Sequence, residues 1–135
     1  MNNILVDTNI LIYGIDESSE FHKRSKEILT GDKFNLFITS KNVSEYFAVC
    51  TKLKIDKEIV LGFYNDIKKN TIILYPNDNS IKKFEMLVKK YFPTGNRVYD
   101  LEIVSVMLAN DVKYLATFNT KDFDNIKEIS LINKQ

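Results

Sequence analysis

The chain has 135 residues, a formal net charge of +1 and a hydrophobic content of 44%, values typical of a globular protein. The near-neutral charge excludes a protein that coats nucleic acid through a broad basic surface. The apolar runs are too short to span a membrane, no secretory signal is recognisable, and Cys50 has no second cysteine to pair with, so we expect one cytoplasmic domain over residues 1–135.

Short strands and amphipathic helices are predicted to alternate in the first half of the chain. The apolar triplet at 4–6 resembles a buried strand and ends abruptly at Asp7. In chain order, the spacing predicts a strand at 4–6, helices through 11–12 and over 21–29, and strands at 36–39 and 71–75. Two further helices are predicted between these last two strands. The first is capped by Thr39 or Ser40 and carries Val43, Phe47 and Cys50, and the second is capped by Asp56 and has the apolar stripe Ile59, Val60, Phe63 and Ile67.

The second half continues this alternation after Pro76. The spacing predicts a helix at 80–91 with the apolar stripe Ile81, Phe84, Leu87 and Val88, a loop at 93–96, a buried helix at 101–109, and strands at 114–117 and 129–132. The alternation favours an α/β sandwich with a mainly parallel sheet. Asp7, Asn119 and Asp122 each follow a predicted strand, so we expect them at the same edge of that sheet.

Four acidic residues stand where a buried element meets a loop. Carboxylates beside apolar runs cost free energy unless a hydrogen-bond network or a bound cation offsets it. The four motifs are ILVDTN at Asp7, VSEY at Glu45, VYDLEI at Asp100 and TFNTKDF at Asp122.

Two of these acids have mainly apolar neighbours at helical spacing. Glu45 is followed by Ala48 and Val49 three and four residues later, which is unusual for a solvated helix face. Asp100 heads the apolar stripe of the buried helix in its first turn, where the helix N-terminus stabilises negative charge.

Each acid also has a purely structural interpretation. Asp7 could begin an Asx-turn or cap a helix, Asp100 could be an N-cap, Glu45 could pair with a lysine and Asp122 could be a turn residue. Four coincidences around one sheet edge favour a shared site instead. Arg97, three residues before Asp100, is either a solvated arginine or close enough to bind a phosphate.

The ligand types indicate the chemistry. Carboxylate oxygens suit Mg²⁺ or Mn²⁺ rather than structural zinc, and such ions activate water for phosphodiester hydrolysis. The only histidine, His22, lies in a charged segment and is expected at the surface, while Cys50 is expected in the core. Short polar side chains that could orient the carboxylates or a metal-bound water are those of Thr8, Asn9, Thr117 and Asn119.

The order DTN, SEY, YDLEI and TFNTKDF resembles that of PIN domains, and specifically of VapC-like toxin ribonucleases of type II toxin–antitoxin systems. The resemblance spans Asp7 to Phe123. It implies a PIN-like three-layer α/β/α sandwich and cleavage of single-stranded RNA with Mg²⁺ or Mn²⁺. Acidic positions of the family match Asp7, Glu45 and Asp100, with Asp7 and Asp100 as metal ligands; we expect Asp122, assisted by Asn119, to fill the fourth position, and Glu102 could join the site.

The resemblance also implies partners. VapC-like toxins usually form homodimers and are inhibited by a small antitoxin that directs a basic or aromatic side chain toward the acidic pocket. Three alternatives remain: an inactive PIN-fold binding module, a housekeeping RNA-processing nuclease, and a phosphatase with Asp7 as nucleophile. The phosphatase is disfavoured because Asn9 stands where such enzymes carry a second aspartate. The sequence does not specify which RNA is cleaved, or whether one or two ions bind.

Overall fold

A computed structural model describes residues 2–132, so the ends of the expected domain, residues 1 and 133–135, lie outside the described part. The elements in chain order are β1 (Asn2–Val6), α1 (Thr8–Ile15), α2 (His22–Thr30), β2 (Phe34–Thr39), α3 (Ser40–Lys52), α4 (Lys57–Asn70), β3 (Thr71–Leu74), α5 (Asp78–Tyr91), α6 (Arg97–Ala109), β4 (Tyr114–Ala116), α7 (Thr120–Phe123) and β5 (Ser130–Leu131).

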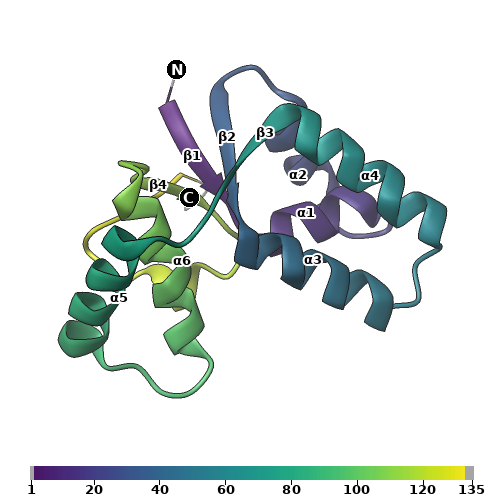
Figure 1. Ribbon diagram of the computed structural model, residues 1–135. Coiled ribbons are helices and arrows are strands. Elements are labelled where there is room, and N and C mark those ends of the chain that lie inside the picture. Colours follow the sequence, from purple (N-terminus) through teal and green to yellow (C-terminus); the bar gives the residue numbers. More distant parts are fainter. Residues whose placement is uncertain (1, 133–135) are drawn as a thin grey trace.

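The five strands form one sheet in the order β3-β2-β1-β4-β5, and every pairing in it is parallel. The prediction of a mainly parallel sheet is therefore confirmed. From β1 the chain builds outward through β2 to β3, then returns to place β4 on the other side of β1 (Figure 1). The strand order reverses between β1 and β4, which is where open parallel sheets place their ligand sites.

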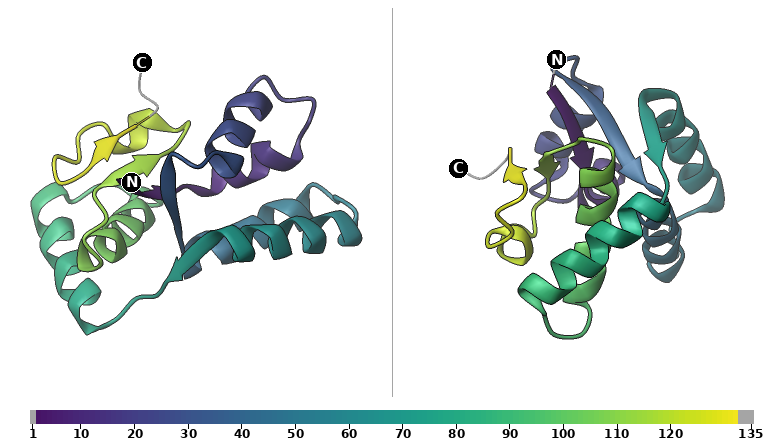
Figure 2. Two further views of the ribbon diagram at one scale, coloured as in Figure 1. Left: turned by 90° about the horizontal axis from the view of Figure 1, so that it is seen from above. Right: turned by 60° about the vertical axis from the view of Figure 1, so that its left-hand side comes forward.

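Helices cover both faces of the sheet and produce three layers. Figures 1 and 2 show α1 to α4 on one side and α5 and α6 on the other. Alternation along β1 explains how one strand serves two cores: Ile4 and Val6 join the cluster under α1 to α4, whereas Leu5 joins the cluster under α5 and α6. All three side chains are fully buried, as expected for a central strand of a parallel sheet.

Two predicted core residues are exposed instead. Ile59 in α4 is 55% exposed and Ile81 in α5 is 51% exposed, although each lies on the helical stripe assigned from the sequence. Both stand in the first turn of their helix, and Figure 1 shows the first turn of α4 at the end farthest from the sheet. Helical spacing identifies a face, but it does not show which turns of that face the rest of the molecule covers.

The boundaries near the acidic residues differ from those predicted in informative ways. The last long helix begins at Arg97 rather than Leu101, with Asn96 at its N-cap, so the interpretation of Asp100 as a plain N-cap is wrong. Asp100 does lie in the first turn, as predicted. The short helix α7, which contains Asp122, was not predicted because four residues are too few to show a helical period.

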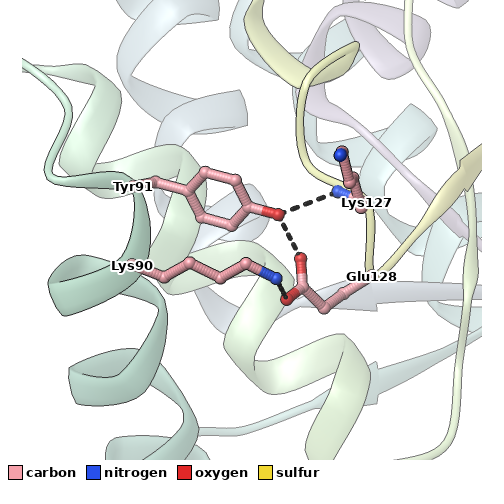
Figure 3. Close-up of polar contacts among 4 residues, drawn as sticks. All are labelled: Lys90, Tyr91, Lys127 and Glu128. Atoms are coloured by element: carbon pink, nitrogen blue, oxygen red, sulfur yellow. Dashed lines mark hydrogen bonds and ion pairs between the residues drawn. The ribbon is translucent and has the colours of Figure 1, made fainter.

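The end of α5 is tied to the segment between α7 and β5. Nζ of Lys90 lies 2.7 Å from Oε2 of Glu128, and the Tyr91 hydroxyl donates a 2.5 Å hydrogen bond to Oε1 of the same carboxylate (Figure 3). The backbone N–H of Lys127 donates to the Tyr91 hydroxyl at 3.0 Å. Burial raises the pKa of Glu128, but these hydrogen bonds outweigh it and hold the pKa below its usual value. Within residues 2–132, no helix has both the length and the apolar character needed to cross a membrane.

Candidate active site

Asp7 and Thr117 lie side by side at the carboxyl edge of the sheet, where the strand order reverses. Asp7 follows β1 and is the N-cap of α1, while Thr117 follows β4. The backbone N–H of Asp7 donates to the carbonyl oxygen of Ala116 at 2.9 Å, which extends the pairing of the two strands to this point. Asp7 is only 7% exposed, so its carboxylate is held within the edge of the core.

Three hydrogen bonds fix the carboxylate of Asp7. Oδ1 accepts from the backbone N–H of Thr8 at 2.9 Å, and Oδ2 accepts from the Thr117 hydroxyl at 2.7 Å and from the Asn9 amide at 3.2 Å. Asn9 is itself held by the backbone N–H of Phe118, which donates to its Oδ1 at 3.1 Å. Burial raises the pKa of Asp7, and the bonds from Thr117 and Thr8 oppose that effect.

Glu45 is connected to the start of α1 through the cap of α3. The Thr8 hydroxyl donates to Oε1 of Glu45 at 3.2 Å, and the Asn42 side-chain amide donates to the Thr8 hydroxyl at 3.0 Å. Asn42 in turn forms a capping box with Thr39, the residue that ends β2. The strand end, the helix cap and the carboxylate therefore form one hydrogen-bonded chain. Asn42 was not identified from the sequence; its signal is its place three residues after the cap.

The pKa values of Asp7, Glu45 and Asp100 are each raised in part by the charge of another acid of the group, which indicates that the acids lie close together. Burial first, and then the charges of Asp122 and Asp7, raise the pKa of half-buried Asp100 to about 7. Burial and the charge of Asp7 raise the pKa of Glu45. The charge of Asp122 also acts on Asp7. The fold thus gathers four carboxylates, from the end of β1 and from α3, α6 and α7, into one region of excess negative charge.

Two depressions meet at this acidic region and share Glu45 and Asp100. The first, of about 410 Å³, runs between α1 and α3 past Asp7. We call its apolar part the apolar groove, formed by Ile12, Tyr13, Val49, Leu53 and Ile103. The second, of about 390 Å³, also includes Asp122. We call its other part the basic shelf, formed by Lys41, Asn96, Arg97 and Tyr99.

The remaining polar residues of the predicted site fall around these depressions. Asn119 is exposed and lines the first depression, and its backbone N–H donates to the Thr117 hydroxyl at 3.0 Å. Asp122 lines the second depression and stands in the first turn of α7. Glu102 lies near enough for its charge to raise the pKa of Glu45.

Arg97 is not a freely solvated arginine. Its Nη2 donates to the backbone carbonyl oxygens of Asp122 at 3.2 Å and Lys121 at 3.4 Å, which joins the start of α6 to α7. Its charge also opposes the rise in the pKa of Asp100 that burial and the neighbouring acids cause, so the guanidinium lies near the acids.

The other nucleophile and ligand candidates lie outside this region. Nδ1 of His22 is 2.8 Å from the carbonyl oxygen of Tyr13, so this partly buried histidine links α2 to α1 rather than lying free at the surface. Cys50 is fully buried in the core, as predicted, and burial raises the pKa of its thiol, which keeps it protonated.

The acidic region offers the donor chemistry of a Mg²⁺ or Mn²⁺ site. All four acids present oxygen, and the charge repulsion that helps to raise the pKa values of Asp7, Glu45 and Asp100 is one that a divalent cation would relieve. As the side chains stand in residues 2–132, no three acidic, histidine or cysteine residues converge into a ligand cluster. The residues therefore fit an ion held by one or two carboxylates that keeps several waters, which is the usual mode for Mg²⁺.

The sequence model of the PIN domain family matches residues 4–129. A search of curated proteins finds no match. Among solved structures, the chain is similar to VapBC2 from Rickettsia felis bound to a promoter DNA fragment, with 21% identity over 98% of this chain and 99% of that one and a TM-score of 0.74. It is also similar to VapBC-1 from nontypeable Haemophilus influenzae, with 22% identity over 96% of each chain and a TM-score of 0.68.

Another solved structure of similar fold is that of a toxin. VapC20 from Mycobacterium tuberculosis, described as a toxin that cleaves the sarcin–ricin loop, is 12% identical over 83% of this chain and 86% of that one, with a TM-score of 0.66. At these identities the structural matches establish a VapC-like fold, and the family match establishes the family.

Proposed function

The chain belongs to the PIN domain family, and from this premise we propose that it is a metal-dependent endoribonuclease that cleaves single-stranded RNA. Nuclease activity is general for this family, and PIN nucleases generally use divalent metals. The observation that carries the proposal is the group of four carboxylates at the strand-order reversal, with the pKa of Asp100 raised to about 7 by burial and by its acidic neighbours.

In this proposal Asp7 and Asp100 hold the ion, and Glu45 and Asp122 complete the acidic group. A carboxylate has roughly four acceptor positions, and Asp7 uses three of them, so one remains for a cation. The side chain of Asp100 accepts no hydrogen bond from residues 2–132, which leaves its oxygens free. When bound, Mg²⁺ or Mn²⁺ would supply an activated water and stabilise the leaving oxygen of a phosphodiester.

The polar neighbours keep this arrangement in place before any ion or substrate arrives. Thr117 and Asn9 fix one oxygen of Asp7, and the Thr8 hydroxyl orients Glu45. Asn119 stands at the mouth of the first depression, where its amide would contact a substrate. Such orientation matters because a small displacement of a reacting group costs much of the rate.

We further propose that the protein is the toxin of a toxin–antitoxin pair and forms a homodimer. The structures with a similar fold include toxin–antitoxin complexes, although their identities to this chain are low. The apolar groove beside the acids would suit a peptide with apolar side chains and one basic side chain. The same chemistry would let an antitoxin block the site.

A catalytically inactive binding module is the second candidate. The absence of a converged ligand cluster within residues 2–132 is the observation in its favour. A phosphatase that uses Asp7 as nucleophile has no such support, because the Asn9 amide donates to Asp7 and cannot exchange a proton as an acid or base would.

The deciding experiment is cleavage of total RNA by the purified protein with Mg²⁺, with Mn²⁺ and with EDTA, beside Asp100→Asn. Asp100→Asn is a cleaner variant than Asp7→Asn, because an amide at position 7 would set its NH₂ group against the donors on Asn9 or Thr117. Metal-dependent fragments that disappear in Asp100→Asn support the nuclease. A folded wild-type protein that cleaves no RNA with either metal supports the binding module.

A further inference from the structure

The surroundings of the acidic region are chemically asymmetric. The lining of the first depression includes the apolar groove and Asp16, but no lysine or arginine among residues 2–132. The second depression carries two cations, Lys41 and Arg97, at its border. An RNA strand is anionic at every nucleotide, so the phosphates on either side of the scissile one are repelled by the acids and need positive charge nearby.

Lys41 is held in a position suited to a phosphate. Its Nζ lies 4.1 Å from the centre of the Tyr99 ring, a cation–π contact that joins α3 to α6. Lys41 stands one turn before Glu45, and its charge opposes the rise in the pKa of that carboxyl caused by burial and Asp7, which places the Lys41 charge near the acids. It has no ion pair with an acid among residues 2–132, so its ammonium remains able to bind an anion.

Arg97 is the second cation of the basic shelf. One nitrogen of its guanidinium is used by the backbone carbonyl oxygens of α7, which fixes the group, and the other two nitrogens make no hydrogen bond with residues 2–132. Tyr99, whose ring has the Lys41 ammonium over it, also lines the second depression and is 50% exposed. Unpaired bases of single-stranded RNA commonly stack on such exposed aromatic rings, between cations that track the backbone.

We propose that the basic shelf is the surface along which the RNA strand lies, with Lys41 and Arg97 binding phosphates that flank the scissile one and Tyr99 stacking on a base. The inference rests on the proposed nuclease function and adds to it the residues that position the substrate.

The test measures binding of a single-stranded RNA oligonucleotide of mixed sequence by fluorescence anisotropy. The Asp100→Asn background prevents cleavage, and KCl is varied at a fixed Mg²⁺ concentration. Loss of one phosphate contact reduces the slope of log K against log salt by about 0.7 for single strands. We therefore expect Lys41→Gln to bind more weakly with a slope smaller by about 0.7, and Lys41→Arg to retain the parental slope.

Lys113→Gln is the matched control for charge, because Lys113 is exposed and directly precedes β4, at the opposite edge of the sheet. It is expected to change neither affinity nor slope. Tyr99→Leu is expected to weaken binding about 5- to 100-fold, while Tyr99→Phe keeps the ring and the affinity. Arg97 is left unchanged in this test, because its replacement would also release α7.

Cleavage of the same oligonucleotide by the protein with Asp100 intact distinguishes a failure of the basic-shelf proposal from a failure of the nuclease proposal. An increase in KM for Lys41→Gln, with thermal stability and kcat close to wild type, supports the basic shelf. Normal cleavage together with unchanged affinity and slope in Lys41→Gln overturns the proposal that RNA binds the basic shelf, but it does not contradict the nuclease function. The ligand of the shelf would then be an acidic protein segment. Absence of both binding and cleavage in the parent proteins overturns both proposals.

Discussion

The hydroxyl group of Thr117 donates a 2.7 Å hydrogen bond to the carboxylate of Asp7, although 110 positions separate the two residues. The bond exists because β1 and β4 are neighbours in the sheet, so both residues follow paired strands. The same hydroxyl oxygen accepts from the Asn9 amide and from the backbone N–H of Asn119. One fully buried threonine therefore connects three of the polar residues expected at the site.

Thr117→Val should impair both stability and cleavage. The substitution keeps the shape of the side chain but removes the donor to Asp7 and the acceptor for Asn9 and Asn119. Leaving such buried groups without partners costs about 1–3 kcal/mol. Urea unfolding would measure the loss of stability, and an RNA cleavage assay would measure the loss of rate. Thr117→Ser, which keeps the hydroxyl, should retain most of both; equal losses in the two variants would contradict this role.

Asp100→Asn should stabilise the metal-free protein, and more so at alkaline pH. The pKa of Asp100 is about 7 in the folded protein, against a usual value of 3.8, so the folded state binds the proton more tightly than the unfolded state. Wild-type stability must therefore fall as pH rises from about 4 to 7, whereas asparagine carries no charge. Melting temperatures in EDTA at pH 5 and pH 8 provide the measurement. If the difference in melting temperature between the variant and the wild type does not grow with pH, the pKa of Asp100 is not raised in the folded protein.

Mg²⁺ and Mn²⁺ should raise the melting temperature of the wild-type protein. An ion that binds only the folded state stabilises it by RT ln(1 + [L]/Kd), and here it would also relieve the repulsion between Asp7 and Asp100. The increase should be strongly reduced in Asp100→Asn and unaffected by replacing an acid far from the site, such as Asp66 in α4. Thermal shifts across a metal titration test this without any substrate. Equal shifts in all three proteins would place the ion elsewhere.

Ser25→Ala should stabilise the protein. Ser25 is fully buried in α2, and its hydroxyl is the one buried side-chain polar atom in residues 2–132 that lacks a hydrogen-bond partner. Removing an unsatisfied hydroxyl should recover about 1–2 kcal/mol, in addition to a few tenths from the better helix propensity of alanine. Ser44→Ala, at an exposed helical position in α3, controls for propensity alone. If urea unfolding gives equal gains for both variants, the hydroxyl of Ser25 carries no penalty.

The fold could be predicted from the sequence to a large extent because its signals are local. Apolar triplets such as 4–6 predicted strands, and helical spacing predicted the long helices, so their alternation was enough for a parallel sheet. The acids were found because each interrupts an apolar pattern, as Asp7 does at the end of β1. The short helix α7 and the exposure of Ile59 were missed, since neither has a local signature.

The connections of the site could not be predicted in the same way. The hydrogen bond from Thr8 to Glu45 depends on how α1 and α3 lie against each other, and so does the support of Thr8 by Asn42. The same is true of Lys41 over Tyr99, which joins α3 to α6. No periodicity within one element records the distance between two side chains on different elements.

Local properties of the chain, which are the strand and helix periods and the direction of the strands, were enough to predict the strands and the long helices and to place Asp7 and Asp122 at one edge of a parallel sheet. Which side chains meet at that edge depends on how distant elements pack, and so could be seen only in the folded molecule. Tertiary packing half-buries Asp100 beside Asp122 and Asp7, which raises the pKa of Asp100. It also leaves cations on one border of the acids and an apolar groove on the other.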